Sequence, residues 1–450
     1  MRIRSITGLW LGRMTKWVLW ALGRKGTSLP GLVAARVAPR LLEELLNQLS
    51  TCVIVTGTNG KTTTTAFLYA FLNDGEAWLT NRGGANLQQG LLAALLAKSD
   101  WWGRLQVKKA VLEVDEATLP KVTAKFHPQA IVVTNVLRDQ LDRYGEVDLA
   151  LRMLSEGTRY AGTALITNAD DPLAMSLGLG RPELTYYYGM TGVVDTTARR
   201  TDVRDGAFCL ICGRELEYAY FIYGQIGAYR CPEGHFERPQ PTFAGRWERA
   251  GRRLVVCEAE PNTAEEFTVE SPVRGVFNQY NLLAAASAAR VLGVSPKALR
   301  RRVQNFAPPT GRFQVFPGAP ERVLVLIKNP TGANGVLRAL EDDAAAKAVC
   351  FVINDDDADG RDVSWLWDIN LEEFIPCSRA AEWLCGGTRG LDMALRLAYA
   401  GIERTQIRVL DKLAQVAEVS ADGVETVYIL STYTALHPLS DLLKEVANRG

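Results

Sequence analysis

The chain has 450 residues, of which 47% are hydrophobic and 22% are charged, and its formal net charge is +1. This composition is ordinary for a soluble globular protein of two or three domains, and the balanced charge gives the whole molecule no bias toward nucleic acid or other polyanions. No apolar run reaches the ~18–20 residues that a membrane-spanning helix needs, so we expect a cytoplasmic protein.

Residues 1–45 are predicted to form a basic segment that precedes the main domains. The first 40 residues include eight Arg and Lys residues and no acid. Residues 6–24 place Trp10, Met14 and Trp17 at helical spacing among these basic side chains. The pattern is typical of an amphipathic helix, which either lies on an anionic membrane surface or packs on the protein with a solvated basic face. We favour packing on the protein.

Residues 46–310 are predicted to form a doubly wound α/β domain with a largely parallel sheet, because short apolar runs alternate with helical patterns as far as about residue 200. The predicted strands are Cys52–Thr56, Lys109–Val114, Ala130–Thr134 and Ala164–Thr167, and the predicted helices are Thr62–Asn73, Leu87–Lys98 and Val147–Tyr160. Ligands of such sheets bind at the carboxyl ends of the strands.

A glycine-rich loop follows the first of these strands and opens a helix. The loop consists of Gly57, Thr58, Asn59, Gly60, Lys61, Thr62 and Thr63. Two glycines allow a tight turn whose backbone N–H groups can face phosphate oxygens. Lys61 can reach the β- and γ-phosphates, and the Thr62 hydroxyl is a suitable Mg²⁺ ligand. We therefore predict an ATP site, although Val55 stands where a small residue is usual.

Polar side chains follow the later strands. Glu113 ends a buried strand, where its carboxylate would face Thr62 and complete a Mg²⁺ site; acids at strand ends are also common as solvated residues. Asn278 and Asn281 open a helix of small residues, and they either contact adenine or shape the turn.

A cysteine-rich insert is predicted at about residues 200–247. It contains Cys209, Cys212, Cys231 and His235, a set that predicts a tetrahedral zinc site. In a reducing compartment, such cysteines bind metal more often than they form disulfides. The second half, Cys-Pro-Glu-Gly-His, is unusual for zinc, so a metal-free loop is the alternative.

Residues 311–450 are predicted to form a second α/β domain, which begins after a loop rich in proline and glycine. Its predicted strands are Val323–Ile327, Ala348–Ile353, Gln406–Val409 and Thr426–Leu430, and Asp392–Ala400 is a predicted helix. Six aspartates lie within the 14 residues that begin at Asp355. This loop is a solvated acidic loop, a Ca²⁺ loop or a functional loop, and the missing twelfth-position Glu favours the functional alternative.

Together these motifs resemble the Mur ligase superfamily. The motifs that carry the resemblance are Gly57–Thr63, Glu113, Asn135, Asn168–Asp171, Phe277–Asn281 and Gly311-Arg312, in the family's order. The insert, Arg138–Glu146, Lys328–Pro330 and Ala358–Trp365 are similar to one branch, the MurT family, which forms the ligase-like subunit of lipid II isoglutaminyl synthase. The resemblance runs from about Gly26 to the C-terminal region.

The resemblance implies an ATP-dependent ligase that amidates the α-carboxyl of D-glutamate in the lipid II stem peptide at the membrane surface. It implies that Lys61, Thr62 and Glu113 hold ATP phosphates and Mg²⁺, that Asn278 and Asn281 lie near adenine, that Arg312 lies near the phosphates, and that Lys328 and Asn329 close over ATP. Two departures from the family pattern stand out. Gly234 occupies the position of a fourth cysteine, and Gln140 replaces a metal-binding histidine of many Mur ligases.

The resemblance also implies a partner, a GatD-type glutaminase that supplies ammonia. An aspartate of this chain would complete the partner's Cys–His pair, with Asp359 favoured over Asp355 and Asp362. Three alternatives stay open: a ligase that adds an amino acid, a nucleotide-dependent scaffold without chemistry, and an intrinsic glutaminase that uses Cys377 or Cys385 with His437.

Overall fold

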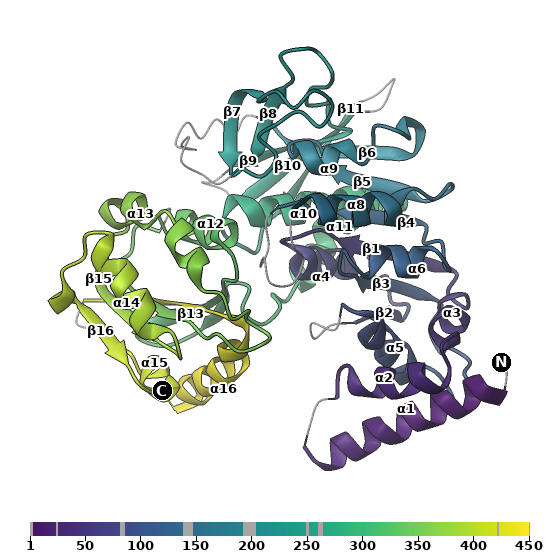
Figure 1. The fold of residues 1–450 in the computed structure, drawn as a ribbon, viewed down its shortest axis with the longest axis horizontal. Helices are drawn as coiled ribbons and strands as arrows, with labels where there is room; N and C mark the ends of the chain where they lie inside the picture. The colour runs from purple at the N-terminus through teal and green to yellow at the C-terminus, as the bar shows by residue number, and fades with distance from the viewer. Residues whose placement is uncertain are drawn as a thin grey trace.

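Two β-sheets, each packed with helices on both faces, organise the chain in the computed structural model (Figure 1). The structure describes residues 3–23, 26–81, 86–137, 147–191, 204–248, 252–259, 264–341, 343–420 and 423–449. The α/β fold class predicted from the sequence is confirmed. The boundaries drawn at 45/46 and 310/311 remain predictions.

The larger sheet has nine strands in the order β11-β10-β9-β6-β5-β4-β1-β3-β2. The strands are β1 Thr51–Thr56, β2 Trp78–Thr80, β3 Lys109–Glu113, β4 Ala130–Val133, β5 Ala164–Asn168, β6 Thr185–Met190, β9 Phe243–Glu248, β10 Arg253–Ala259 and β11 Ala264–Glu270. Along the sheet, the neighbours in the run β9-β6-β5-β4-β1-β3-β2 pair in parallel, whereas β9, β10 and β11 pair antiparallel. The four predicted strands of this region are confirmed as β1, β3, β4 and β5.

The central strand β1 shows why this sheet is buried on both sides. Val53 and Val55 belong to the core on one face, and Cys52 and Ile54 belong to the core on the other. Alternate side chains of a strand point to opposite faces, so a run of β-branched residues needs cover on both. Helices α4 and α10 cover the first face, and α2, α3 and α5 cover the second.

The helices of the first two thirds of the chain are α1 Ile3–Ala21, α2 Leu29–Val37, α3 Leu41–Leu46, α4 Lys61–Leu72, α5 Gln88–Ala97, α6 Leu119–Thr123, α8 Val147–Thr158, α9 Pro172–Ser176, α10 Val276–Val291 and α11 Pro296–Arg302. Two 3-10 helices, η1 Pro182–Leu184 and η2 Val303–Asn305, accompany them. A separate hairpin of β7 Glu217–Tyr223 and β8 Ile226–Arg230 lies in the cysteine-rich insert. The predicted insert, residues 200–247, reaches into β9 of the large sheet.

The smaller sheet has six strands in the order β12-β13-β17-β14-β15-β16. The strands are β12 Gln314–Phe316, β13 Glu321–Leu326, β14 Lys347–Val352, β15 Ala380–Gly386, β16 Ile407–Leu410 and β17 Thr426–Ser431. The helices are α12 Pro330–Glu341, α13 Leu371–Cys377, α14 Gly390–Tyr399, α15 Leu413–Ala417 and α16 Tyr433–Arg449, with η3 Ser364–Asp368 and η4 Arg404–Gln406. The sequence analysis missed β12 and β15, whereas the other four strands match their predictions.

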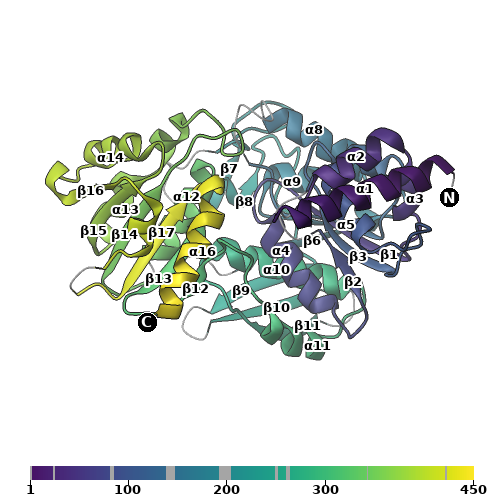
Figure 2. The same ribbon diagram turned by 90° about the horizontal axis from the view of Figure 1, so that it is seen from below.

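The N-terminal helix packs on the protein as predicted, but its outer face differs from the prediction. Ser5, Gly8, Leu9 and Gly12 are its buried residues, and α1 lies beside α2 in both ribbon views (Figures 1 and 2). The face turned to solvent is rich in apolar side chains rather than being mainly basic, with Trp17 67% exposed. Among the described residues, no helix combines the length and the apolar character needed to cross a bilayer.

Gly31 of α2 allows the closest helix contact in this N-terminal layer. A Cβ at this position would lie 1.8 Å from the backbone oxygen of Gln89 in α5. We expect Gly31→Ala to lower the free energy of unfolding by about 1–3 kcal/mol, because the two helices must move apart. Denaturant unfolding measures the change. Gly180→Ala, whose Cβ would meet nothing within 4 Å, is the control and should leave the unfolding midpoint nearly unchanged.

Candidate active site

A cavity of about 570 Å³ lies between the two sheets, where the glycine-rich loop of the larger sheet faces the smaller one. Thirty of the residues that the structure describes line it, and they come from both sheets and from the N-terminal layer. Every residue predicted to contact the nucleotide or Mg²⁺ is among them except Gly57 and Asn329, and Asn329 contacts a lining residue. The topology therefore brings together residues that are 270 positions apart in the sequence.

The glycine-rich loop adopts the conformation that its two glycines allow. Gly57 and Gly60 have φ angles of 114° and 86°, which favour glycine. A Cβ on Gly60 would lie 2.0 Å from Oδ1 of Asn281, so the first turn of α4 packs directly on α10. The N-terminus of α4 opens toward the cavity, where its backbone N–H groups and dipole favour an anion.

Lys61 is buried at the start of α4. Its ammonium donates to the backbone oxygens of Gly57 and Thr58, and it forms an ion pair with Glu116 at 3.3 Å. Burial raises the pKa of the Glu116 carboxyl, and the Lys61 charge opposes that shift. If a phosphate entered beside Lys61, the lysine would exchange its buried carboxylate partner for a phosphate oxygen. Glu116 was not among the residues predicted for the site, although its position three residues after Glu113 was a signal for it.

Thr62 and Glu113 form the pair expected of a magnesium site. The Thr62 hydroxyl donates to Oε1 of Glu113 at 3.1 Å, and Glu113 is 6% exposed. Neighbouring ligands of an octahedral Mg²⁺ at ~2.1 Å lie about 3.0 Å apart. The two oxygens therefore already have the separation of adjacent Mg²⁺ ligands. Asn81 fixes Glu113 from behind, through hydrogen bonds of 2.7 and 2.9 Å to its backbone.

An asparagine cluster links the loop to both sheets. Asn135 accepts from the backbone N–H of Asn59 at 2.9 Å and donates to its backbone oxygen at 3.0 Å. The Asn59 side chain contacts that of Asn329, from the start of α12, at 3.2 and 3.4 Å. The glycine-rich loop is thus held from two directions. Nothing local in the sequence shows that Asn135 reaches Asn59.

Asn278 and Asn281 lie in the first turns of α10 and line the cavity. Asn278 is not the helix cap, which is Gly275; its side chain donates to the backbone oxygen of Arg274 at 2.8 Å. Asn281 donates to Asn278 and accepts from Thr64. Arg312 and Lys328 complete the cationic lining from the side of the smaller sheet.

The three candidate aspartates of the acidic loop have different environments. Asp359 is 4% exposed and lines the cavity, and both of its oxygens accept from Thr434 at the start of α16. The oxygens of Asp355 accept from Thr388 and Arg389. Asp362 is exposed, and the backbone N–H of Ser364 donates to it and lowers its pKa. Exposure therefore favours Asp362 over Asp359 for contact with another protein.

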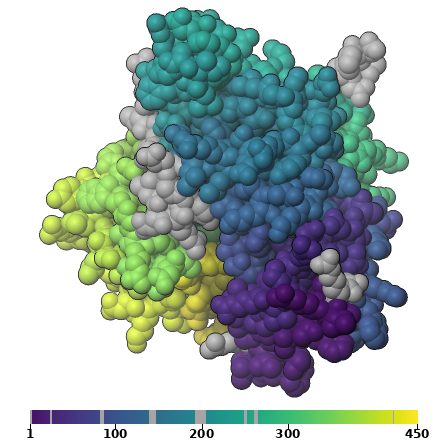
Figure 3. Space-filling model, turned by 45° about the vertical axis from the view of Figure 1, so that its right-hand side comes forward, coloured from purple at the N-terminus to yellow at the C-terminus, as the bar shows by residue number. Residues whose placement is uncertain are grey.

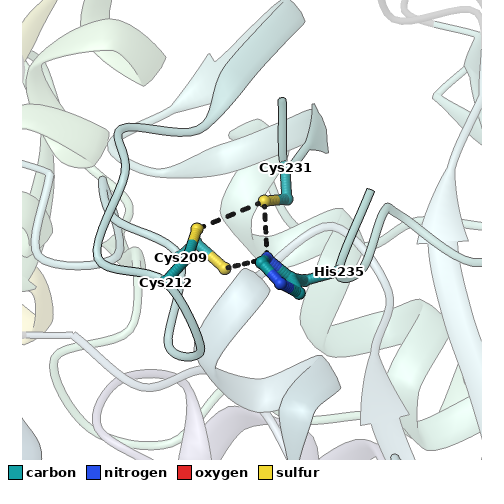
Figure 4. Close-up of side chains that lie close together, drawn as sticks. All are labelled: Cys209, Cys212, Cys231 and His235. Carbon is teal, nitrogen blue, oxygen red and sulfur yellow. Dashed lines mark hydrogen bonds between the residues drawn. The ribbon is translucent and has the colours of Figure 1, made fainter. Parts of the chain in front are cut away.

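Cys209, Cys212, Cys231 and His235 converge beside the β7–β8 hairpin (Figure 4). The Cys212–Cys231 sulfur distance is 3.7 Å, and the Cys231–His235 and Cys209–His235 distances to Nδ1 are 3.4 and 3.9 Å. A tetrahedral zinc site has edges of about 3.5–3.8 Å. Burial opposes ionisation of Cys231, but hydrogen bonds from His235 and the local backbone lower its pKa to about 6. The four groups could hold zinc, with His235 occupying the place that Gly234 leaves open.

Two further expectations from the sequence concern a family motif and the alternative glutaminase function. The motif Arg138–Glu146, with Gln140, lies outside the described residues. For the alternative of an intrinsic glutaminase, Cys385 is a poor nucleophile, because burial raises the pKa of its thiol to about 12.

The insert that carries the cysteine–histidine cluster is tied to the large sheet through two buried aspartates. Asp171 accepts from Gln225 in the hairpin turn and from the backbone of Val136, and burial raises its pKa to about 6. Asp170 accepts from Arg238 and Tyr280. The insert is therefore anchored on the body of the protein.

Comparison with known proteins places these features in one family. The Mur ligase middle domain matches residues 55–215, and the MurT ligase C-terminal domain matches residues 326–436. The MurT subunit of the lipid II isoglutaminyl synthase (glutamine-hydrolyzing) of Staphylococcus aureus strain COL is 31% identical over 454 residues, covering 100% of both chains. A pseudomurein peptide ligase type C from Methanothermus fervidus has a similar fold (TM-score 0.65, 21% identity, 91% of this chain and 84% of that one). MurF ligase from Thermotoga maritima, solved in complex with ADP, also has a similar fold (TM-score 0.60, 15% identity, covering 92% of this chain and 84% of that one).

Proposed function

The chain belongs to the MurT family of lipid II isoglutaminyl synthase subunits, and from this premise we propose that it amidates the α-carboxyl of D-glutamate in the lipid II stem peptide. It is an ATP-dependent ligase of peptidoglycan synthesis. The observation that carries the proposal is the cavity in which Lys61 and the Thr62–Glu113 pair face residues of the second sheet. ATP and Mg²⁺ fit that lining, since it offers a helix N-terminus, cationic side chains and a paired hydroxyl and carboxylate.

The residues of this chain would act by position and charge. The substrate carboxylate attacks the γ-phosphorus of ATP, giving an acyl phosphate and ADP. Lys61 and Arg312 would neutralise the charge that develops on the phosphoryl oxygens, and Thr62 and Glu113 would hold Mg²⁺, which supplies Lewis-acid charge when bound. Ammonia then attacks the carbonyl carbon, and phosphate leaves with one oxygen of the original carboxylate. Asn59 and Asn329 would keep the two sides of the cavity together.

Ammonia would come from a glutaminase partner of the GatD type. An exposed apolar patch on the smaller sheet supports this: Trp367, Leu391, Leu395 and Tyr399 are 52%, 74%, 45% and 71% exposed. The patch lies at η3 and α14, next to Arg389, which pairs with Asp355 of the acidic loop. An apolar surface bordered by polar residues is the usual form of a protein interface. A partner docked there would reach Asp362, the carboxylate that we propose for its triad.

Zinc in the four-residue cluster is a further part of the proposal. Metal analysis of the full chain is expected to give one zinc ion per molecule. Cys231→Ser should lose that zinc and lower the melting temperature, because the small module depends on the metal for its stability. Cys257→Ser, in β10 outside the cluster, is the matched control and should retain zinc. Full zinc content in the Cys231 variant would contradict the assignment.

Mass spectrometry of lipid II tests the function. The full chain is incubated with Mg²⁺ and ATP, and with glutamine plus the glutaminase, ammonium alone, or an amino-acid mixture. We expect a mass loss of about one dalton with glutamine only when the partner is present, and weaker conversion with ammonium. A gain of one amino-acid residue would instead identify an adding ligase, and no mass change under any condition would favour a scaffold.

A further inference from the structure

The outer face of α1 is unusual for a helix on the surface of a soluble domain. Three of its four buried residues, Ser5, Gly8 and Gly12, are small, and the fourth is Leu9. On the opposite side, Met14 and Trp17 are 59% and 67% exposed. A surface helix normally turns its apolar side chains inward and its polar ones outward. Here the glycines set a close contact with α2, and most of the large apolar residues other than Leu9 face outward. Other exposed large apolar residues of α1 are Ile3, Trp10, Leu11, Val18 and Trp20.

A turn some ninety positions later extends this face. Nε1 of Trp10 donates to the backbone oxygen of Trp101 at 2.8 Å, and the guanidinium of Arg13 lies 4.5 Å from the centre of the Trp101 ring. Trp101 and Trp102 are 59% and 67% exposed. Asp100 accepts one hydrogen bond from the backbone N–H of Trp102 and one from that of Arg104, so the turn is held in place.

We define the N-terminal aromatic face as Trp10, Met14, Trp17, Trp101 and Trp102, and we propose that it docks on an anionic lipid bilayer. The N-terminal segment that carries the α1 part of this face forms an outer surface of the molecule (Figure 3). Tryptophan is the side chain most typical of the membrane–water interface, and a helix with large apolar and basic residues lies in that interface rather than crossing it.

The positive charge of the N-terminal segment favours an anionic bilayer over a second copy of the chain as the occupant of this face. The first 40 residues contain eight basic residues and no acid, and Lys16 on α1 is exposed. Such a segment is attracted to anionic headgroups by about 1 kcal/mol for each basic residue near the surface. A second copy of the same face would bring these positive charges together and would be repelled. The charge therefore favours an anionic lipid surface over self-association.

The location of the face fits the proposed function, on which this inference rests for its biological sense. Ser28, just before α2, and Leu87, just before α5, line the catalytic cavity. Both helices pack with α1. A bilayer against α1 would therefore lie next to the layer that borders the cavity, where a lipid-linked substrate must enter.

Vesicle sedimentation of the full chain tests the inference. We expect binding to vesicles that contain phosphatidylglycerol and much weaker binding to pure phosphatidylcholine. Met14→Glu/Trp17→Glu should weaken binding by about tenfold or more, because it places two acids on the face. Leu179→Glu, at a residue 52% exposed elsewhere, is the control and should bind like the parent. Melting temperatures verify that all variants fold.

Three results would overturn the inference: equal binding by the double variant, no binding of the parent to either vesicle, or a dimer in sedimentation equilibrium that the variant loses. Amidation of a water-soluble, short-chain lipid II analogue keeps this test separate from the proposed function. The double variant should amidate that analogue normally and lose activity on lipid II embedded in vesicles. Failure of the parent on both substrates would instead count against the proposed function.

Discussion

Replacing Lys61 by alanine is expected to lower kcat for lipid II amidation by about 10²–10³-fold, with either glutamine or ammonium as the nitrogen source. Lys61 is the buried cation at the N-terminus of α4, and the phosphoryl charge that it would stabilise develops in the transition state. Removing one such preorganised group typically costs about 10²–10³-fold. Loss of the phosphate contact in the ground state should also raise KM for ATP, without lowering kcat further.

The control for this variant is Lys109→Ala, in β3 of the same sheet, where the ammonium pairs with Glu76 at 2.6 Å. That pair is partly exposed and contributes little. Single-turnover kinetics compares the two variants, and thermal unfolding verifies that both fold. Removal of Lys61 leaves Glu116 buried without that partner, but burial already raises its pKa, so the carboxyl can take up a proton. Near-parental turnover by Lys61→Ala would remove this lysine from the mechanism.

Asp362→Asn is expected to lower glutamine-supported amidation by about 10³–10⁴-fold while ammonium-supported amidation stays close to that of the parent. A triad aspartate orients the histidine and stabilises its charged form, and loss of that carboxylate has effects of this size in other triads. Ammonium bypasses the glutaminase, so only the partner's reaction should fail.

Two neighbouring variants sharpen this result. Asp357→Asn, in the same exposed loop and paired with Arg361, should leave both activities unchanged. Asp359→Asn should lower both, because Asp359 lines the ATP cavity and holds the start of α16 through Thr434. If Asp359→Asn lost only the glutamine-supported reaction, Asp359, which the sequence analysis favoured, would be the triad aspartate. If Asp362→Asn kept full glutamine-supported activity, our assignment of Asp362 to the triad would be excluded.

Local patterns carried the prediction of the nucleotide site. The glycine-rich loop needs only a strand, two glycines and a helix, all within one stretch of sequence, so Lys61 and Thr62 were identifiable at once. Glu113 followed because parallel strands end at one edge of a sheet. The three cysteines and the histidine proposed to bind zinc were likewise recognisable from their spacing, and the structure brings His235 to the cluster despite Gly234.

Features that depend on contacts between residues far apart in the chain could not be predicted from the sequence. Whether an acidic residue is exposed is decided by the element that packs on its loop, and α16 buries Asp359 from 75 positions away. The Asn59–Asn329 contact spans 270 positions. The orientation of α1 was misjudged because its glycines, which have no side chain to bury, form the packed face; a count of apolar residues at helical spacing assigns Trp10 and Trp17 to the inside.

The most direct measurement follows the fate of oxygen in the substrate carboxyl. Lipid II carrying ¹⁸O in the α-carboxyl of D-glutamate is amidated by the parent chain and its partner with Mg²⁺ and ATP, and the released phosphate is analysed by ³¹P NMR. If the carboxylate is activated in this cavity as an acyl phosphate, one ¹⁸O atom appears in phosphate for each amide formed. Unlabelled phosphate, or label in AMP, would contradict the account.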